Sequence, residues 1–139
     1  MKREIKRTIA ILLVLCFIVS LTATATSAMI IKTSVVDGKS SGGNWAEAEF
    51  DIGGFKYPGT AYVYPTGWGF TFSPGQKDVK NFGIYQMRVW EGKYVWTTGN
   101  YDVRPDGHVR GKFIGMSEAQ DGKQNPFGIR INYLVMQDA

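Results

Sequence analysis

The sequence predicts an all-β protein: a single antiparallel β-sandwich, jelly-roll-like or a meander, of about seven or eight short strands, with a small closed β-barrel as the alternative. After residue 28, short segments alternate between apolar and polar residues, and no convincing helical period interrupts them. Gly, Pro, Asn and Asp cluster between these segments, as they do in turns. Aromatic residues make up 14% of the chain, which supplies a core for packed strands.

Residues 1–28 have the order of a cleavable secretory signal peptide. A basic start is followed by an apolar run at Ile9–Leu21 and a small-residue stretch at Ala23–Ala28. The run is short for a membrane span. An uncleaved anchor at about Thr8–Ala25 and a lipid attached to Cys16 are the alternatives. We expect export, so that the protein is secreted or extracellular and meets the membrane only during export.

The mature chain is then a single all-β domain, residues 29–139, which holds 111 of the 139 residues. The signal carries +3 of the formal net charge of +4, so the domain carries about +1. Nucleic-acid binding, which needs a basic face, is therefore not expected. The one cysteine leaves with the signal, so the domain is disulfide-free and depends on aromatic packing.

The first half of the domain contains four predicted strands. Met29–Val36 is apolar and β-branched, and a flexible Gly- and Ser-rich loop, Asp37–Gly43, follows it. Asn44–Ile52 alternates, with Ala46, Ala48, Phe50 and Ile52 on one side, until Gly53 and Gly54 break it. Thr60–Tyr64 and Trp68–Ser73 are short strands, and we expect the Pro65-Thr66-Gly67 segment between them to form a tight turn.

The second half contains the remaining four predicted strands. Phe82–Trp90, Tyr94–Arg104 and His108–Met116 are expected to be consecutive antiparallel neighbours, because short turns join them. A polar loop at 117–126 follows. In the last strand, Phe127–Gln137, the alternating residues on one face are Phe127, Ile129, Ile131, Tyr133 and Val135.

The two short turns predict a register for the three middle strands. A three-residue turn at Glu91-Gly92-Lys93 places Arg88 opposite Trp96, and a Gly107 bulge places Asp102 opposite Arg110. In that register one face is apolar, and the other is polar with two tryptophans. The apolar face is Tyr85, Met87, Val89, Val95, Thr97, Tyr101, Val103, Val109 and Phe113, and the polar face is Gln86, Arg88, Trp90, Trp96, Thr98, Asn100, Asp102, His108, Arg110 and Lys112. A two-residue Glu91-Gly92 turn is the alternative, and it puts Met87 beside Trp96.

An open sheet face that carries tryptophans among polar groups is typical of carbohydrate-binding surfaces. Sugar rings stack on aromatic side chains, and their hydroxyls bond to amide, guanidinium and carboxylate groups. We therefore expect a non-enzymatic binding module whose partner is an extracellular glycan or cell-envelope polymer. The candidate ligand-binding residues are Arg88, Trp90, Trp96, Asn100, Asp102 and Arg110. The structural alternative is that these residues form ion pairs and cation–π pairs only, or lie under a second sheet.

Other functions have weaker signals in the sequence. Glu47 and Glu49 share one side of a strand at a spacing that suits a glycan hydrolase, although any solvated strand looks similar. A secreted antibacterial effector or inhibitor would act instead through the loops at 37–43 and 117–126. No nucleophile motif accompanies His108, the single histidine, so we expect no catalytic residue, no metal and no cofactor.

Overall fold

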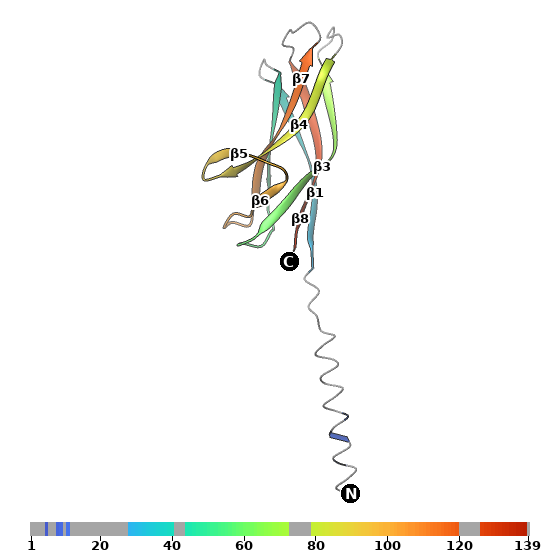
Figure 1. The fold of residues 1–139 in the computed structure, drawn as a ribbon, viewed down its shortest axis with the longest axis vertical. Helices are drawn as coiled ribbons and strands as arrows, with labels where there is room; N and C mark the ends of the chain where they lie inside the picture. The colour runs from blue at the N-terminus through green and yellow to red at the C-terminus, as the bar shows by residue number, and fades with distance from the viewer. Residues whose placement is uncertain are drawn as a thin grey trace.

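The computed structural model describes residues 28–40, 44–72, 79–119 and 126–138, together with residues 5, 8, 9 and 11. Eight strands make up most of this described part (Figure 1). They are β1 (Ile30–Ser40), β2 (Trp45–Ile52), β3 (Thr60–Phe72), β4 (Val79–Trp90), β5 (Lys93–Thr97), β6 (Asn100–Asp102), β7 (Val109–Ala119) and β8 (Phe127–Gln137). The predicted all-β fold of seven or eight strands is confirmed.

The predicted signal peptide lies almost wholly outside the described residues, so it stays a prediction. Within the described residues, no helix has the length and apolar character that a membrane crossing requires.

All eight strands belong to one antiparallel sheet, in the order β5-β4-β7-β2-β1-β8-β3-β6. The two end strands, β5 and β6, follow each other in the chain, so the sheet curls until its ends meet. The Val63 amide donates to the Gly99 carbonyl at 2.7 Å, which continues the β3–β6 ladder up to the bend between β5 and β6. Arg88 on β4 binds Asp102 on β6 at 3.0 Å. The result is a nearly closed barrel with the β4–β5 hairpin projecting from its side, as Figure 1 shows.

The barrel interior is filled by the side chains that alternate inward from each strand. On β2 every second residue is buried, and on β8 the same rule holds with the odd-numbered residues inside. Both patterns confirm the predicted faces of these two strands. Phe50 lies at the centre, with its ring centroid 5.0 Å from Phe113, 5.2 Å from Tyr133 and 5.5 Å from Tyr101.

Several predicted strand boundaries are wrong. β1 continues to Ser40 and β7 to Ala119, into the loops predicted at 37–43 and 117–126. The Pro65-Thr66-Gly67 segment is a β-bulge inside the continuous strand β3, because residues on both sides of it pair with β8. The predicted strand Tyr94–Arg104 is broken after Thr97 into β5 and β6. Gly99 adopts a φ of 104°, a conformation open chiefly to glycine, and this bend sends the chain from one end of the sheet to the other.

The favoured register of the middle strands is also wrong, and its alternative is right. Met87 pairs with Trp96, because the β4–β5 turn has two residues, Glu91 and Gly92. Both have positive φ, 47° and 75°, which is the geometry of a type I′ hairpin turn. The twist of the two strands favours this turn over the longer loop. Asp102 likewise pairs with Thr60 of β3, not with Arg110.

The new register turns the β4 side chains around. Gln86 points inward, where the Tyr101 hydroxyl donates to its side-chain oxygen at 3.4 Å, and it pairs across the ladder with buried Phe113. Tyr85 and Val95, expected in the core, are exposed on the outer surface. The predicted core positions Tyr101, Val103, Val109 and Phe113 are buried, as expected.

A seam separates β3 from β4 at one end of the barrel. β6 pairs with β3 only at Thr60–Tyr62, and β5 pairs with β4 only at Gln86–Trp90, so beyond these segments the two strands face each other without a ladder between them. Aromatic rings fill the seam instead. Trp68 and Phe82 lie 5.2 Å apart by ring centroid, and both are about half exposed.

Candidate functional site

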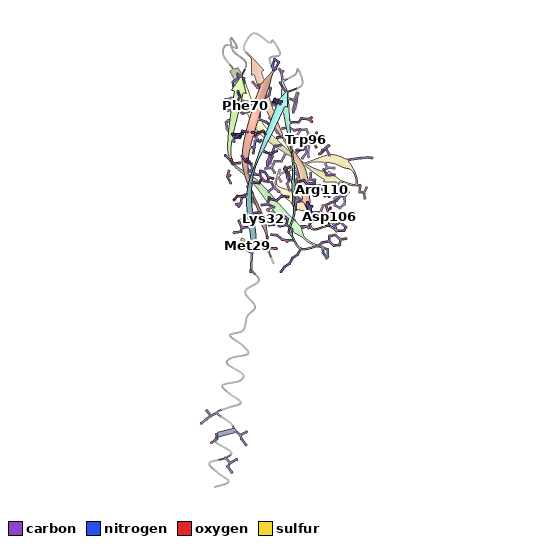
Figure 2. The ribbon with its side chains drawn as sticks, turned by 180° about the vertical axis from the view of Figure 1, so that it is seen from behind. Met29, Lys32, Phe70, Trp96, Asp106 and Arg110 are labelled. Atoms are coloured by element: carbon purple, nitrogen blue, oxygen red, sulfur yellow. The ribbon has the colours of Figure 1, made fainter. Side chains whose placement is uncertain are left out.

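The structure divides the six candidate ligand-binding residues among four places. Arg88, Trp90 and Asp102 come together where the two ends of the sheet meet. Trp96 lies on the outer face of the β4–β5 hairpin, visible in Figure 2. Asn100 is exposed at the start of β6, where its carbonyl accepts from the Thr97 hydroxyl. Arg110 belongs to a separate polar network on β7. The six do not form one continuous face.

A surface pocket of about 430 Å³ lies beside Trp90, and we call it the Trp90 pocket. Its walls are residues 57–59, residues 89–91 at the end of β4, and residues 102–105 after β6. Trp90 and Tyr57 are both exposed, by 43% and 57% of their surface. The pocket thus joins two aromatic rings and two prolines with the charged groups of Glu91, Asp102 and Arg104, an apolar surface with a few polar groups that suits a small ligand.

Backbone hydrogen bonds hold the walls of the Trp90 pocket in place. The Val103 amide donates to the Gly59 carbonyl at 2.9 Å, which ties the exit of β6 to the segment before β3. The Arg104 amide donates to the His108 carbonyl at 2.8 Å, and the Gly107 amide donates to the Arg104 carbonyl at 2.8 Å. The predicted turn at 104–108 is therefore present locally, although the strands beyond it separate. These bonds fix the backbone on both sides of Arg104.

Arg88 orients the polar side of the same pocket. Its guanidinium lies 5.0 Å from the Trp90 ring centroid and donates to Asp102 Oδ2 at 3.0 Å. One face of the Trp90 ring is thus occupied by a cation, which supports the ring's orientation. Among the described residues, Arg88 Nε is buried without a hydrogen-bond partner and Asp102 Oδ1 accepts no bond. Asp102 can therefore accept a hydrogen bond from a ligand while it stays paired with Arg88.

Trp96 belongs to a row of exposed aromatic residues outside the barrel. Its ring centroid lies 6.2 Å from Tyr85, and Tyr85 lies 6.5 Å from Trp45. The rings are tilted by 79° and 43° to one another, so they pack edge-on and do not form a flat platform. Trp96 is exposed like Trp90, but it does not line the Trp90 pocket.

Glu47 and Glu49, predicted on one side of the same strand, both pair with one lysine on β7. Lys112, almost fully buried, lies 2.6 Å from Glu47 and 3.3 Å from Glu49, and its ammonium sits over the Tyr94 ring. Hydrogen bonds from Tyr94 and Lys112 lower the pKa of Glu49. Neither carboxylate lines either of the two main surface pockets of the described chain. This pairing explains the two glutamates as supports of Lys112 and adds nothing in favour of a hydrolase.

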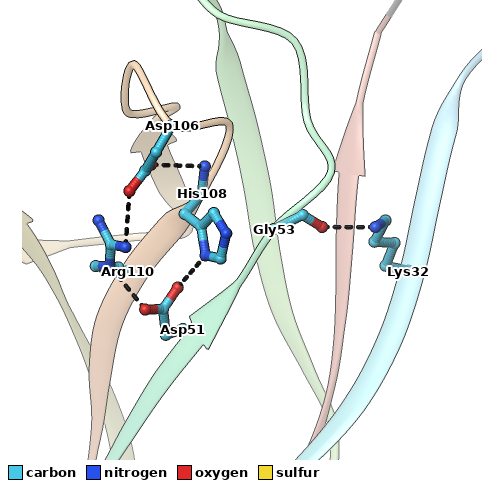
Figure 3. A network of polar contacts seen from close by, with 6 residues as sticks. All are labelled: Lys32, Asp51, Gly53, Asp106, His108 and Arg110. Carbon is cyan, nitrogen blue, oxygen red and sulfur yellow. Dashed lines mark hydrogen bonds and ion pairs between the residues drawn. The ribbon is translucent and has the colours of Figure 1, made fainter.

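A second polar network joins β2 to the turn before β7 (Figure 3). Asp51 accepts from Arg110 Nε at 2.8 Å and contacts His108 Nδ1 at 2.5 Å. Asp106 accepts from Arg110 at 2.8 Å and caps the His108 amide at 3.1 Å. On the neighbouring strand, Lys32 donates to the Gly53 carbonyl. The contacts of Asp51 and Asp106 with His108 and Arg110 hold the turn that carries Arg104 against β2.

The network gives a pH-dependent contribution to stability. Burial raises the pKa of Asp51, but hydrogen bonds from Arg110 and His108 outweigh it and leave the pKa below the ordinary 3.8. A carboxyl whose pKa is lower in the folded state stabilises fully above its unfolded pKa, and that contribution is lost as the pH falls below it. We therefore expect the free energy of unfolding of wild type to exceed that of Asp51→Asn at about pH 5, and the difference to shrink towards about pH 2. Urea unfolding at each pH measures this, and a difference that does not change with pH would contradict it.

A larger pocket of about 610 Å³ opens at the far end of the barrel, between β1, β3 and β8. Phe72 and Phe127 line it, and Arg130 forms a two-bonded ion pair with Asp37 at its edge. Three of its lining residues, Ser40, Phe72 and Pro126, are the last described positions before or after residues 41–43, 73–78 and 120–125, which lie outside the described residues. Of the loops that an effector or inhibitor would use, residues 37–40 belong to β1, residues 117–119 belong to β7, and the rest except Pro126 lie outside the described residues, so that hypothesis gains no structural support.

Comparisons with known proteins give little to set beside this geometry. No protein-family model matches the chain, and no curated protein matches it. Among solved structures, the chain is similar to the cryo-EM structure of the virus-like particle of extra small virus of the giant freshwater prawn Macrobrachium rosenbergii. The TM-score is 0.27 and the identity 11%, over 78% of this chain and 79% of that chain. A TM-score this low supports no inference about fold or function.

Proposed function

We propose that the chain is an exported, non-enzymatic binding module that recognises a glycan or cell-envelope polymer at the Trp90 pocket. Export follows from the order of basic, apolar and small residues in the first 28 positions. The near-neutral, thiol-free domain that remains carries few catalytic residue types, and this favours recognition over catalysis.

The observation that supports this function best is the composition of the Trp90 pocket. Trp90 and Tyr57 offer exposed aromatic surface to the apolar C–H face of a sugar ring. Asp102 Oδ1 and the Arg104 guanidinium supply an acceptor and donors for hydroxyl groups beside these rings. The ligand would bind where the two ends of the sheet meet, on walls that hydrogen bonds already hold together.

Replacing Trp90 by alanine tests the function directly. We expect Trp90→Ala to weaken binding to retained polysaccharides by roughly 30-fold, because truncating a central aromatic anchor commonly costs about 2 kcal/mol or more of binding free energy. Retention on a panel of insoluble polysaccharides, followed by affinity measurement on those retained, gives the readout.

Trp96→Ala is the matched control, since Trp96 is a tryptophan of similar exposure that lies outside the pocket. We expect it to bind as wild type does. Circular dichroism establishes that both variants stay folded. Equal binding by wild type and Trp90→Ala, or failure of wild type to bind any polymer of the panel, would reject the Trp90 pocket as a glycan site.

A further inference from the structure

The charges that line the Trp90 pocket are unequally neutralised. Asp102 is paired with Arg88, so these two contribute little net charge. Arg104 is half-buried in the pocket wall, and within the described residues its guanidinium takes part in no ion pair or hydrogen bond. Glu91, the other charged group of the lining, is exposed at the tip of the β4–β5 turn. Of the two unpaired charges of the pocket, Arg104 and Glu91, Arg104 is therefore the one less screened by solvent.

The position of Arg104 is held by the fold and not by a charge partner. Its amide and carbonyl are both bonded within the 104–108 turn, and the preceding residue is bonded to Gly59. The carboxylates nearest in the chain are already committed: Asp102 binds Arg88, and Asp106 binds Arg110. The turn thus places Arg104 in the wall of a pocket that Trp90 and Tyr57 also line, while both neighbouring acids are paired with other arginines.

From this arrangement we infer that the Trp90 pocket binds an anionic saccharide, with Arg104 contacting its negatively charged oxygens while the sugar ring lies against Trp90. The inference rests on the proposed function and names its ligand class. A guanidinium presents parallel N–H donors that match the two oxygens of a carboxylate or the oxygens of a phosphate. Either group could supply this chemistry: the carboxylate of a uronic acid, or the phosphate of a phosphodiester-linked sugar polymer.

Glu91 opposes such a ligand only weakly. Solvent surrounds it at the turn, and the interaction of exposed charges is screened by water and salt. Because Arg104 is half-buried, water screens its interaction with a charged ligand less than it screens that of Glu91. The two residues therefore make opposite predictions of unequal size: removing the positive charge of Arg104 weakens binding strongly, and removing the negative charge of Glu91 strengthens it slightly.

The test uses immobilised polymers in matched pairs. Polygalacturonate, alginate and hyaluronate are each compared with the carboxyl-reduced form of the same polymer, and a wall teichoic acid supplies the phosphate arm. Cellulose, xylan and chitin are the neutral members. We expect wild type to bind the best-bound acidic polymer at least about 10-fold more tightly than the neutral counterpart of that polymer. Arg104→Gln should weaken binding of the acidic polymer by about the same factor, the usual effect of removing one charge-assisted hydrogen-bonded pair.

Two further variants separate charge from geometry. Arg104→Lys keeps the charge without the two parallel donors, so its affinity should lie between those of wild type and Arg104→Gln. Glu91→Gln should bind the acidic polymer about 2-fold more tightly and leave binding of neutral polymers unchanged. Preference for uronic acid polymers or for the teichoic acid identifies the source of the anion.

The outcomes distinguish the two proposals. If wild type binds neutral and acidic forms equally through Trp90, and Arg104→Gln changes neither, the anionic ligand is rejected and the glycan site stands. If Trp90→Ala has no effect, or wild type binds no polymer, both proposals fall. Raised salt gives a second readout, because it should weaken binding of the acidic polymers and not of the neutral ones.

Discussion

Phe50→Ala is expected to lower the free energy of unfolding by about 3–5 kcal/mol, the usual cost of truncating a buried phenylalanine. Phe50 is 4% exposed, and its ring contacts the rings of Phe113, Tyr101 and Tyr133. These three come from β7, β6 and β8, so Phe50 joins strands from across the whole sheet to β2. An alanine would leave a cavity that the surrounding strands, held in place by their ladders, cannot close.

Phe82→Ala is the matched control for this prediction. It removes the same atoms from a side chain that is 55% exposed and packs only at the seam. We expect a loss of about 1 kcal/mol, the scale of its aromatic contacts. Urea unfolding of the two variants measures the difference, provided that the free energy of unfolding falls with urea at the same slope in both. If Phe50→Ala were no more destabilising than Phe82→Ala, the centre of the core would have to lie elsewhere.

β2 and β8 are two strands whose faces could be predicted from the sequence. β2 and β8 each have one face inside and one outside along their full length, so alternation in the sequence translates directly into burial. For example, Ala48 and Ile131 are buried as predicted. Because this alternation is local, it predicts the buried face without knowledge of which strands are neighbours.

The register and partners of β4, β5 and β6 could not be derived in the same way. The separation of polar from apolar residues favoured a three-residue turn, but the positive φ of Glu91 and Gly92 selects the two-residue turn. The sequence of Tyr94–Arg104 holds no local signal that its two halves lie at opposite ends of one sheet. That outcome depends on closure of the barrel, which is set by pairing between residues far apart in the chain.

For the same reason, only part of the grouping of residues at the Trp90 pocket could be predicted from the sequence. Arg88, Trp90 and Asp102 were grouped on one sheet face, and the structure does bring them together, although through barrel closure and not through the expected ladder. Tyr57 and Arg104 were missed. Both lie in connecting segments, where no periodicity assigns a face, and they reach the pocket only because the segment before β3 bonds to the exit of β6.

Gly111→Ala is expected to lower the free energy of unfolding by about 1–3 kcal/mol or more, as overpacking of a well-filled core does. Gly111 lies on β7 between Phe50 and Arg88 of the neighbouring strands. A Cβ atom at this position would lie 2.6 Å from the Met87 carbonyl oxygen and 2.6 Å from ring atoms of both Phe50 and Tyr101. The Phe50 ring cannot turn away because it packs on Phe113 and Tyr133, the Tyr101 ring is buried against Phe50, and the carbonyl belongs to a ladder. The backbone of β4 or β7 has to move.

Gly69→Ala makes the same chemical change in another strand of the barrel. A Cβ atom at Gly69 meets no atom within 4 Å, so the substitution only restricts the unfolded chain. We expect the free energy of unfolding to stay unchanged or to rise by up to about 1 kcal/mol. Urea unfolding of the two variants therefore gives changes of opposite sign for one added methyl group. Equal destabilisation would mean that the cost reflects alanine in a strand, whereas a loss confined to Gly111 would show that the barrel interior is filled up to the β7 backbone.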